Sequence, residues 1–362
     1  MLLVFFAFMK TLIPKALRRG EVIGLISPSS TCAEPEKIQQ AVTYLERCGY
    51  RVKTSLYLNR SEHDPAHTDR YKLHDLHQMF ADGDVRAIFC LRGGAGATRL
   101  LDRIDYSLIA ANPKILVGYS DITALSLAVY RKTGLVNFSG PMAATELFAP
   151  SGYTEEHFWG VLTDPAYSKK LANFSGHEIG CVRPGAVNGR LIGGNLSVLS
   201  SLVGTPYLPS FSGSILFTED VNEPAYRIDR MLSHLFNAGL AQKCRGIMFG
   251  QFSKNPADEN RDYRFDKIFT YYANRMHEGA PVMTGLSYGH IAELMTLPVG
   301  AKCRLEISPE QFAFGAAEAV VRAPLRPMVR VNRCVLVRIS TRRTGWGALC
   351  AAATARFSSV AA

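Results

Sequence analysis

The chain has 362 residues, of which 47% are hydrophobic and 20% charged, a composition typical of globular proteins that excludes a fibrous or largely disordered chain. Because this length exceeds that of one average domain, we expect two packed domains. The formal net charge is +10, and eight arginines from Arg322 onward, where no Asp or Glu occurs, account for most of it. The remainder is close to neutral and carries no basic stripe interleaved with aromatic residues, so we expect no nucleic-acid partner.

The cysteines and the N-terminal residues indicate the cellular compartment of the protein. Eight cysteines are scattered without a C-x-x-C pair, which predicts neither a zinc ribbon nor a disulfide framework and favours a reducing, cytoplasmic location. The first eight residues, MLLVFFAF, are too few to span a bilayer and lack the flanks of a signal peptide. We therefore expect no membrane association and a natural start at Met9, with an atypical export signal as the alternative.

Strands and helices alternate in the first half of the chain. Short apolar runs predict buried strands at residues 22–26, 85–91 and 114–119. Apolar residues at helical spacing predict helices at 35–48 and from Ser120 to Gly134, with a shorter helical stretch at 98–104. Such alternation indicates an α/β fold in which helices cover a parallel sheet.

The second half has shorter and more irregular elements. Prolines and glycines punctuate a stretch that we interpret as a linker, residues 166–184, between an N-terminal domain at 9–165 and a smaller mixed α/β domain at 185–322. Strands are expected at 214–218, 246–252, 282–288 and 303–307, and a helix at 224–237. Residues 323–362 show no periodicity, and we interpret them as a disordered or misframed tail.

Ser120 is the first residue that could carry chemistry. It follows the buried strand 114–119, has Gly118 two positions before it and opens a helix. A serine at such a turn is exposed as in a nucleophile elbow, and the helix N-terminus stabilises a developing oxyanion. The alternative is a simple helix cap, since the second glycine of G-x-S-x-G is missing.

The glycine-rich segment Arg92-Gly93-Gly94-Ala95-Gly96 ends the preceding strand. Glycines let backbone amides approach a reacting carbonyl closely, so Gly94 is a candidate oxyanion-hole donor. The alternatives are an ordinary glycine turn or a phosphate loop. The second is disfavoured because neither G-x-x-x-x-G-K-[ST] nor G-x-G-x-x-G occurs.

A hydroxyl nucleophile needs a base, and the base needs an orienting partner. His290 lies in a glycine-rich segment after the expected strand 282–288, and Glu219 ends the strand 214–218, where a carboxylate can meet an imidazole. Each residue alone is as well explained by a structural role.

Four other histidines crowd one segment, but a proline interrupts their spacing and no second ligand cluster is evident, so we expect no metal. These histidines are His63, His67, His74 and His77.

Six stretches, in this order, resemble the LD-carboxypeptidase family of serine peptidases, which includes muramoyltetrapeptide carboxypeptidases and microcin C self-immunity peptidases. They are 23–30 (IGLISPSS), 87–96 (AIFCLRGGAG), 116–123 (LVGYSDIT), 189–197 (GRLIGGNLS), 216–229 (LFTEDVNEPAYRID) and 289–300 (GHIAELMTLPVG), within roughly residues 9 to 320. The resemblance implies Ser120 as nucleophile, His290 as general base and Glu219 as its orienting carboxylate. It also implies an oxyanion hole from the backbone amides of Gly94 and Asp121, no cofactor, and a homodimer.

The resemblance also implies a substrate. In a murein tetrapeptide, the bond between the L-centre of the third residue and the terminal D-Ala would be cleaved during peptidoglycan recycling. The D-Ala carboxylate needs a cation, for which Arg92, Arg190 and Arg227 are candidates, and Asn195 is a further substrate-binding candidate. Two departures are Ala95, where the family often has an aromatic residue, and the tail after Arg322, which matches nothing in the family.

Two other functions remain open. One is an immunity-type peptidase that cleaves a peptidyl-nucleotide antibiotic, which a stacking aromatic residue such as Trp159 in the cleft would favour. The other is a non-catalytic two-domain binding protein on the same fold, which loss of a triad residue would have favoured.

The tail leads to a first testable prediction. A chain shortened to end at Arg322 should keep the thermal midpoint and the peptide turnover of the full-length protein, because a segment that buries little apolar area contributes little stability. Differential scanning fluorimetry and a peptide-release assay on both chains test this. Unfolding on truncation would place the tail in the core. Salt-sensitive binding to nucleic acid or anionic lipid that truncation abolishes would give its arginines a function.

Overall fold

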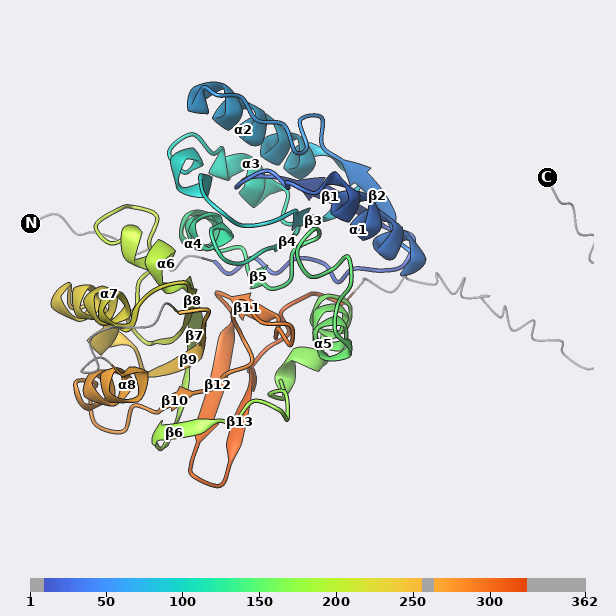
Figure 1. Cartoon of the computed structure of the whole chain (residues 1–362). Helices are drawn as coiled ribbons and strands as arrows, with labels where there is room; N and C mark the ends of the chain where they lie inside the picture. The colour runs from blue at the N-terminus through green and yellow to red at the C-terminus, as the bar shows by residue number, and fades with distance from the viewer. Residues whose placement is uncertain (1–9, 256–263, 324–362) are drawn as a thin grey trace, which may run out of the picture. The chain divides into compact units, whose positions relative to one another are not determined.

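Two β-sheets form the framework of the protein (Figure 1). The structure, a computed structural model, describes residues 10–255 and 264–323. The first eight residues and the tail beyond residue 323 therefore lie outside the described residues, as do the expectations that concern them.

The first sheet has six strands, and every neighbouring pair in it is parallel except the pair at one edge. Its order is β11 (Leu297–Val299), β5 (Asn137–Ser139), β4 (Ile115–Val117), β3 (Val85–Cys90), β1 (Val22–Ile26) and β2 (Arg51–Thr54). The helices of this part are α1 (Pro35–Arg47), α2 (Pro65–Ala81), η1 (Ala97–Leu100), α3 (Tyr106–Ala111), α4 (Ile122–Thr133) and α5 (Gly152–Thr163). The expected parallel-sheet domain is confirmed.

The second sheet has seven strands and is mixed, as expected. Its order is β13 (Phe312–Ala316), β12 (Lys302–Ile307), β7 (Gly185–Asn195), β8 (Ser214–Val221), β9 (Gly246–Ser253), β10 (Val282–Thr284) and β6 (Gly180–Arg183). The four central strands from β7 to β10 are parallel, and the outer pairs are antiparallel. Its helices are α6 (Leu196–Ser201), α7 (Ala225–Asn237), η3 (Ala241–Lys243) and α8 (Phe265–Asn274).

Local signals in the sequence predict several element ends correctly. The strand expected at 22–26 is β1, and α4 ends where Gly134 adopts a φ of 74°, a left-handed conformation that glycine favours. Two elements are shorter than expected. The helical spacing at 98–104 produces only η1 and a turn, and the strand expected at 282–288 stops at Thr284 because Gly285 turns the chain with a φ of 81°.

The expected linker, residues 166–184, is partly structured. It contains η2 (Tyr167–Lys169) and the edge strand β6, so the second sheet begins before the expected boundary at residue 185. All four residues of β6 are half-buried, so the strand lacks the alternation of buried and exposed positions by which a sequence pattern reveals a strand. After strands β6 to β10 have formed much of the second sheet, the chain returns to the first sheet. There β11 pairs antiparallel with β5 at the edge.

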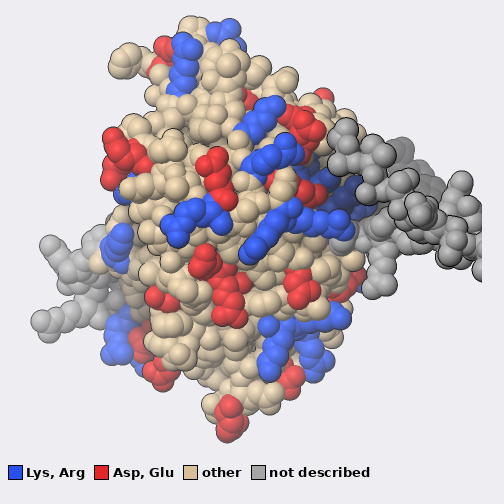
Figure 2. All heavy atoms as spheres, turned by 90° about the vertical axis from the view of Figure 1, so that its right-hand side faces the viewer, with Lys and Arg blue, Asp and Glu red and all other residues tan. Residues whose placement is uncertain are grey.

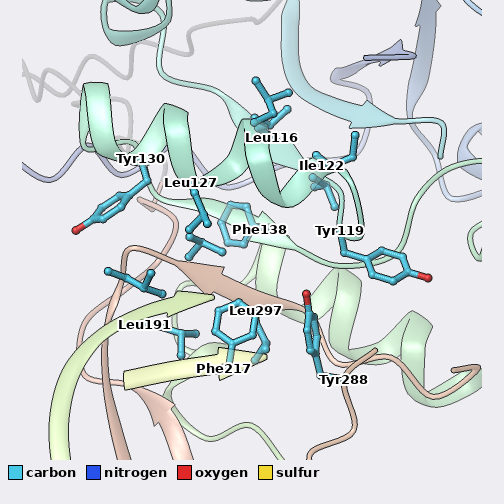
Figure 3. Close-up of a cluster of buried hydrophobic side chains, with 14 of the residues drawn as sticks. Leu116, Tyr119, Ile122, Leu127, Tyr130, Phe138, Leu191, Phe217, Tyr288 and Leu297 are labelled. Carbon is cyan, nitrogen blue, oxygen red and sulfur yellow. The ribbon is translucent and has the colours of Figure 1, made fainter. Parts of the chain in front are cut away.

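One apolar core joins the two sheets (Figure 3). Leu127 and Phe138 from the first part lie next to Leu191 and Phe217 from the second. Each of these side chains is at most 1% exposed, and full burial of such a side chain contributes about 1.5–3 kcal/mol. This core holds the two sheets in a fixed relation, which a site with residues from both sheets requires.

Charged side chains of both signs are interspersed on the face that Figure 2 shows. A large field of one sign, the usual footprint of a nucleic-acid site, does not cover this face. The absence of a nucleic-acid partner stays a prediction. Within residues 10–255 and 264–323, no helix is both long enough and apolar enough to cross a bilayer.

Candidate active site

Ser120 lies at a tight turn between β4 and α4. Its φ of 61° is a left-handed conformation that costs a residue other than glycine about 1–2 kcal/mol. The turn is held because the Ser120 carbonyl accepts a 2.9 Å hydrogen bond from the backbone amide of Thr123. The first turn of α4 therefore begins directly behind the serine, and its side chain remains partly exposed.

A chain of two hydrogen bonds joins Ser120 to residues of the second sheet. The His290 Nε2 atom lies 3.0 Å from the Ser120 Oγ, and its Nδ1 atom lies 2.8 Å from Oε2 of Glu219. Because an ionised carboxylate only accepts, Nδ1 carries the proton and Nε2 is left to accept from the serine hydroxyl. Serine, imidazole and carboxylate thus have the geometry of a general-base nucleophile system.

Two glycines let the chain pass close to Glu219. A Cβ atom on Gly289 would lie 3.4 Å from Oε2 of Glu219 and 2.9 Å from the Gln251 carbonyl oxygen. A Cβ atom on Gly250 would lie 2.4 Å from the Tyr288 carbonyl oxygen. Larger residues at these positions would push the segment that carries His290 away from the carboxylate.

The electrostatics of the pair favour a protonated imidazole. Burial lowers the pKa of His290, but the hydrogen bond and the negative charge of Glu219 outweigh it, so the pKa is raised above its ordinary value. Glu219 is fully buried, which raises the pKa of its carboxyl, while the hydrogen bonds from His290 and Asn195 lower it. A raised pKa makes the imidazole a stronger base.

The glycine segment after β3 packs directly on the serine. A Cβ atom on Gly93 would lie 2.8 Å from Cβ and 2.9 Å from Oγ of Ser120. Gly94 has a φ of 117°, and a Cβ atom there would collide with the Ser30 side chain. The glycine segment is therefore held closely between Ser120 and Ser30, and the role of the Gly94 amide as an oxyanion donor stays a prediction.

The side chain of Asp121 ties three loops together. Its Oδ2 atom accepts hydrogen bonds from the Ser29 hydroxyl at 2.6 Å and from the Ala97 amide at 2.9 Å. Ser29 follows β1, Ala97 follows the glycine segment, and Asp121 follows the nucleophile. The residue is 6% exposed, and its carboxylate therefore fixes the loops after β1, β3 and β4 relative to one another. The oxyanion hole from the amides of Gly94 and Asp121 stays a prediction.

Asn195 donates hydrogen bonds to the carboxylates of Glu219 and Asp220. Its Nδ2 atom donates to Oε1 of Glu219 at 3.2 Å and to Oδ1 of Asp220 at 3.0 Å. Its backbone amide donates to the Thr123 hydroxyl at 3.0 Å, which links the second sheet to α4. These contacts give Asn195 a positioning role that the sequence did not reveal, while its expected role in substrate binding stays a prediction.

The three candidate arginines lie in different places. Arg92 directly precedes the glycine segment and donates from one nitrogen to the Thr31 carbonyl at 3.1 Å. Arg227, in the first turn of α7, forms a 3.2 Å ion pair with Glu223. Arg92 is therefore the chain neighbour of Gly93, which packs on Ser120.

The sheet register argues against Arg190 as a substrate ligand. In the β7–β8 pair Arg190 lies opposite Ser214, whereas Asn195 lies opposite Glu219. Five residues of extended strand correspond to about 16 Å. The guanidinium of Arg190 donates to the Gly300 carbonyl at 2.8 Å instead.

The four clustered histidines do not converge. Three of them, His67, His74 and His77, are on α2, where His74 contacts its neighbour Asp75 and His77 accepts from the backbone amide of Asp105 at 3.0 Å. Within the part of the chain that the structure describes, no three His, Cys, Asp or Glu side chains are grouped so as to hold a metal ion.

Three residues near the triad were missed in the sequence. Tyr119 donates to Glu146 at 2.6 Å, and its ring centroid lies 5.0 Å from that of His290. The Tyr288 hydroxyl lies 2.6 Å from that of Ser139 and links the segment before His290 to β5. Tyr119 and Tyr288 adjoin the catalytic candidates in the sequence and could have been noticed, whereas nothing in the sequence around Glu146 marks it.

Comparison with known proteins identifies the class. A family model described as the LD-carboxypeptidase N-terminal domain matches residues 23–140, and one described as the LD-carboxypeptidase C-terminal domain matches residues 188–305. The chain therefore belongs to the LD-carboxypeptidase family and is a hydrolase of the serine type.

Three similar proteins show how far the similarity extends. The chain is 35% identical to a probable murein peptide carboxypeptidase of Bacillus subtilis over 81% of this chain and 91% of that protein. It is 33% identical to the murein tetrapeptide carboxypeptidase of Pseudomonas aeruginosa, over 78% and 92%. Among solved structures, an MccF-like protein from Bacillus anthracis matches with a TM-score of 0.75 at 29% identity, over 85% of this chain and all of that one.

The packing of Gly93 on the serine generates a prediction. Gly93→Ala should lower the rate at which a fluorophosphonate labels Ser120 by about 100-fold, because displacing a nucleophile by roughly 1 Å costs that much. Labelling is followed by intact-protein mass spectrometry. Gly83→Ala is the matched control, since no atom lies within 4 Å of a Cβ atom there. Equal labelling rates in the two variants would mean that the glycine segment does not constrain the nucleophile.

Proposed function

We propose that the protein is a murein tetrapeptide carboxypeptidase that hydrolyses the L,D-peptide bond to the terminal D-Ala. The observation that carries this proposal is the unbroken chain from Ser120 through His290 to Glu219. The names of the Bacillus and Pseudomonas relatives support a murein peptide as substrate. Release of D-Ala from tetrapeptide, measured by mass spectrometry of the products, tests it.

In the first step, His290 acts as general base. It takes the hydroxyl proton of Ser120 at Nε2 while Oγ bonds to the carbonyl carbon of the third residue. Glu219 stabilises the imidazolium and keeps its own charge. The carbonyl oxygen becomes an oxyanion, which the backbone amides of Gly94 and Asp121 stabilise by hydrogen bonds.

In the second step, the tetrahedral intermediate collapses. The C–N bond breaks, and His290 returns its proton to the leaving nitrogen of D-Ala, which departs as the amine. The acyl group remains on Ser120. Water then attacks this ester with His290 as base, which releases the tripeptide and restores the hydroxyl.

The D-Ala carboxylate needs a cation beside this site. Of the three candidate arginines, we favour Arg92, because it directly precedes Gly93, which packs on Ser120, and because its hydrogen bond to the Thr31 carbonyl uses one guanidinium nitrogen. A guanidinium can hold a carboxylate through two parallel hydrogen bonds. Arg92 is therefore our candidate for the residue that selects a free C-terminus.

The immunity-type alternative has structural support in the MccF-like fold match. The aromatic residue considered for base stacking, Trp159, is engaged elsewhere. Its ring stacks on Tyr50 at 4.8 Å and its Nε1 atom donates to the Tyr44 hydroxyl at 2.9 Å. The murein peptide therefore remains the better proposal. A non-catalytic binding protein is disfavoured because serine, imidazole and carboxylate are all present and in contact. We also expect a cytoplasmic homodimer.

The proposed triad predicts the effect of substitutions. Ser120→Ala and His290→Ala should each lower kcat for D-Ala release by at least about 10³-fold with folding intact, and Glu219→Gln somewhat less, because the three residues act as a unit. The exposed Ser107 and His67 provide the matched controls Ser107→Ala and His67→Ala. Turnover near that of the wild type in a folded Ser120→Ala variant would end the serine-hydrolase mechanism.

The absence of a metal requirement is a separate prediction. Activity should survive dialysis against EDTA, and paired alanine substitutions among His63, His67, His74 and His77 should be tolerated, because the mechanism needs no Lewis acid. Steady-state D-Ala release before and after chelation is the measurement. Activity that EDTA abolishes and zinc restores would require a different mechanism.

A further inference from the structure

A hydrogen-bonded tyrosine–carboxylate pair, Tyr119 and Glu146, lies beside His290. Glu146 belongs to the turn that follows β5, and its Oε1 atom accepts the Tyr119 hydroxyl at 2.6 Å. Its Oε2 atom accepts the backbone amide of Met142 at 2.9 Å. Tyr119 is 1% exposed, so its hydroxyl has been removed from water and its hydrogen bond to Glu146 replaces the lost hydration.

The ring of Tyr119 places this pair next to the imidazole of His290. Tyr119 directly precedes Ser120, and its ring lies 5.0 Å from the His290 ring at an interplanar angle of 55°. Figure 3 shows Tyr119 on the loop after β4, on the same side of the core as Tyr288, which is two residues before His290. Tyr119 therefore touches both the nucleophile's backbone and the base's side chain.

We propose that Tyr119 and Glu146 are positioning residues for His290: the ring of Tyr119 fixes the imidazole plane, and the carboxylate of Glu146 adds negative charge that stabilises the imidazolium. This role goes beyond the triad and rests on the proposed function of His290 as general base. Glu219 orients the imidazole through Nδ1, and the Tyr119–Glu146 pair acts on it from the first sheet.

The charges around His290 make the role measurable. The carboxylates that raise its pKa are Glu219 and Asp220 from β8 and Glu146 from the turn after β5. The other titratable groups close to the pair are the Tyr119 and Tyr288 hydroxyls, whose pKa values burial raises well above the ordinary value, so both are neutral. Burial also raises the pKa of Glu146 to about 7, against the hydrogen bonds from Tyr119 and Met142 that lower it.

The negative charge of Glu146 should affect the pH dependence of activity in a definite direction. A general base must be neutral to act, so the acid limb of the kcat/KM profile reports the pKa of His290 in the free enzyme. A negative charge nearby raises that pKa, and its removal lowers it. Glu146→Gln should therefore move the acid limb to lower pH and reduce the plateau several-fold. Because the pKa of Glu146 is about 7, its carboxylate is only partly ionised over this limb, so the shift should be less than about one pH unit.

The chain contains a matched control pair. The Tyr44 hydroxyl donates to Glu155 at 2.7 Å, with the same chemistry as the Tyr119–Glu146 hydrogen bond but beside Trp159. Glu155→Gln should leave the acid limb unmoved. Tyr119→Phe keeps the ring but removes the hydrogen bond that favours the ionised form of Glu146, so it should move the limb in the same direction by less.

The experiment measures pH profiles of D-Ala release for the full-length wild type and the three variants, with thermal midpoints as a check on folding. A purely structural role would lower the midpoint of Glu146→Gln and leave the limb in place, which would overturn the proposal. If Glu146→Gln does not fold, Tyr119→Phe decides by the same criterion. The pH dependence of fluorophosphonate labelling is measured in parallel. If the wild type is labelled but releases no D-Ala, the substrate is wrong while the labelling profiles still test the pair.

Discussion

The hydrogen bond between His290 and Ser120 is the contact on which the rest of the site depends, because it joins side chains carried by two separate sheets. Ser120 belongs to the turn after β4 of the first sheet, whereas Glu219 lies in β8 of the second. A displacement of roughly 1 Å at this contact would slow proton transfer by about 100-fold. The common core, the return of β11 to the first sheet and the Tyr288–Ser139 hydrogen bond all hold the two parts at the required separation.

Excess negative charge is the second property of the site. Glu219, Asp220 and Glu146 all act on one imidazole, and each is held by donors: Asn195 for the first two and backbone or tyrosine groups for Glu146. Such charge stabilises an imidazolium, but it would repel a substrate carboxylate. A cation beside the nucleophile would resolve this conflict, and we propose Arg92 for this role.

Local signals in the sequence determined the elements and the chemistry-bearing positions. The apolar run of β1, the helix α7 and the left-handed glycine that ends α4 depend on neighbours in the chain, so their patterns are readable without tertiary structure. The serine after a buried strand and the ordered family motifs likewise predicted which hydroxyl, imidazole and carboxylate would meet, and the structure brings those three together.

Only the tertiary structure decided the relations between distant segments. Strand register sets Arg190 at the opposite end of β8 from Glu219, although the two lie in neighbouring motifs. The antiparallel return of β11 and the half-buried edge strand β6 have no local pattern that announces them. Glu146 reaches His290 through a tyrosine 27 positions earlier in the chain. A single sequence shows which groups are available, but long-range packing and register determine which of them share a site, because those contacts depend on the whole core.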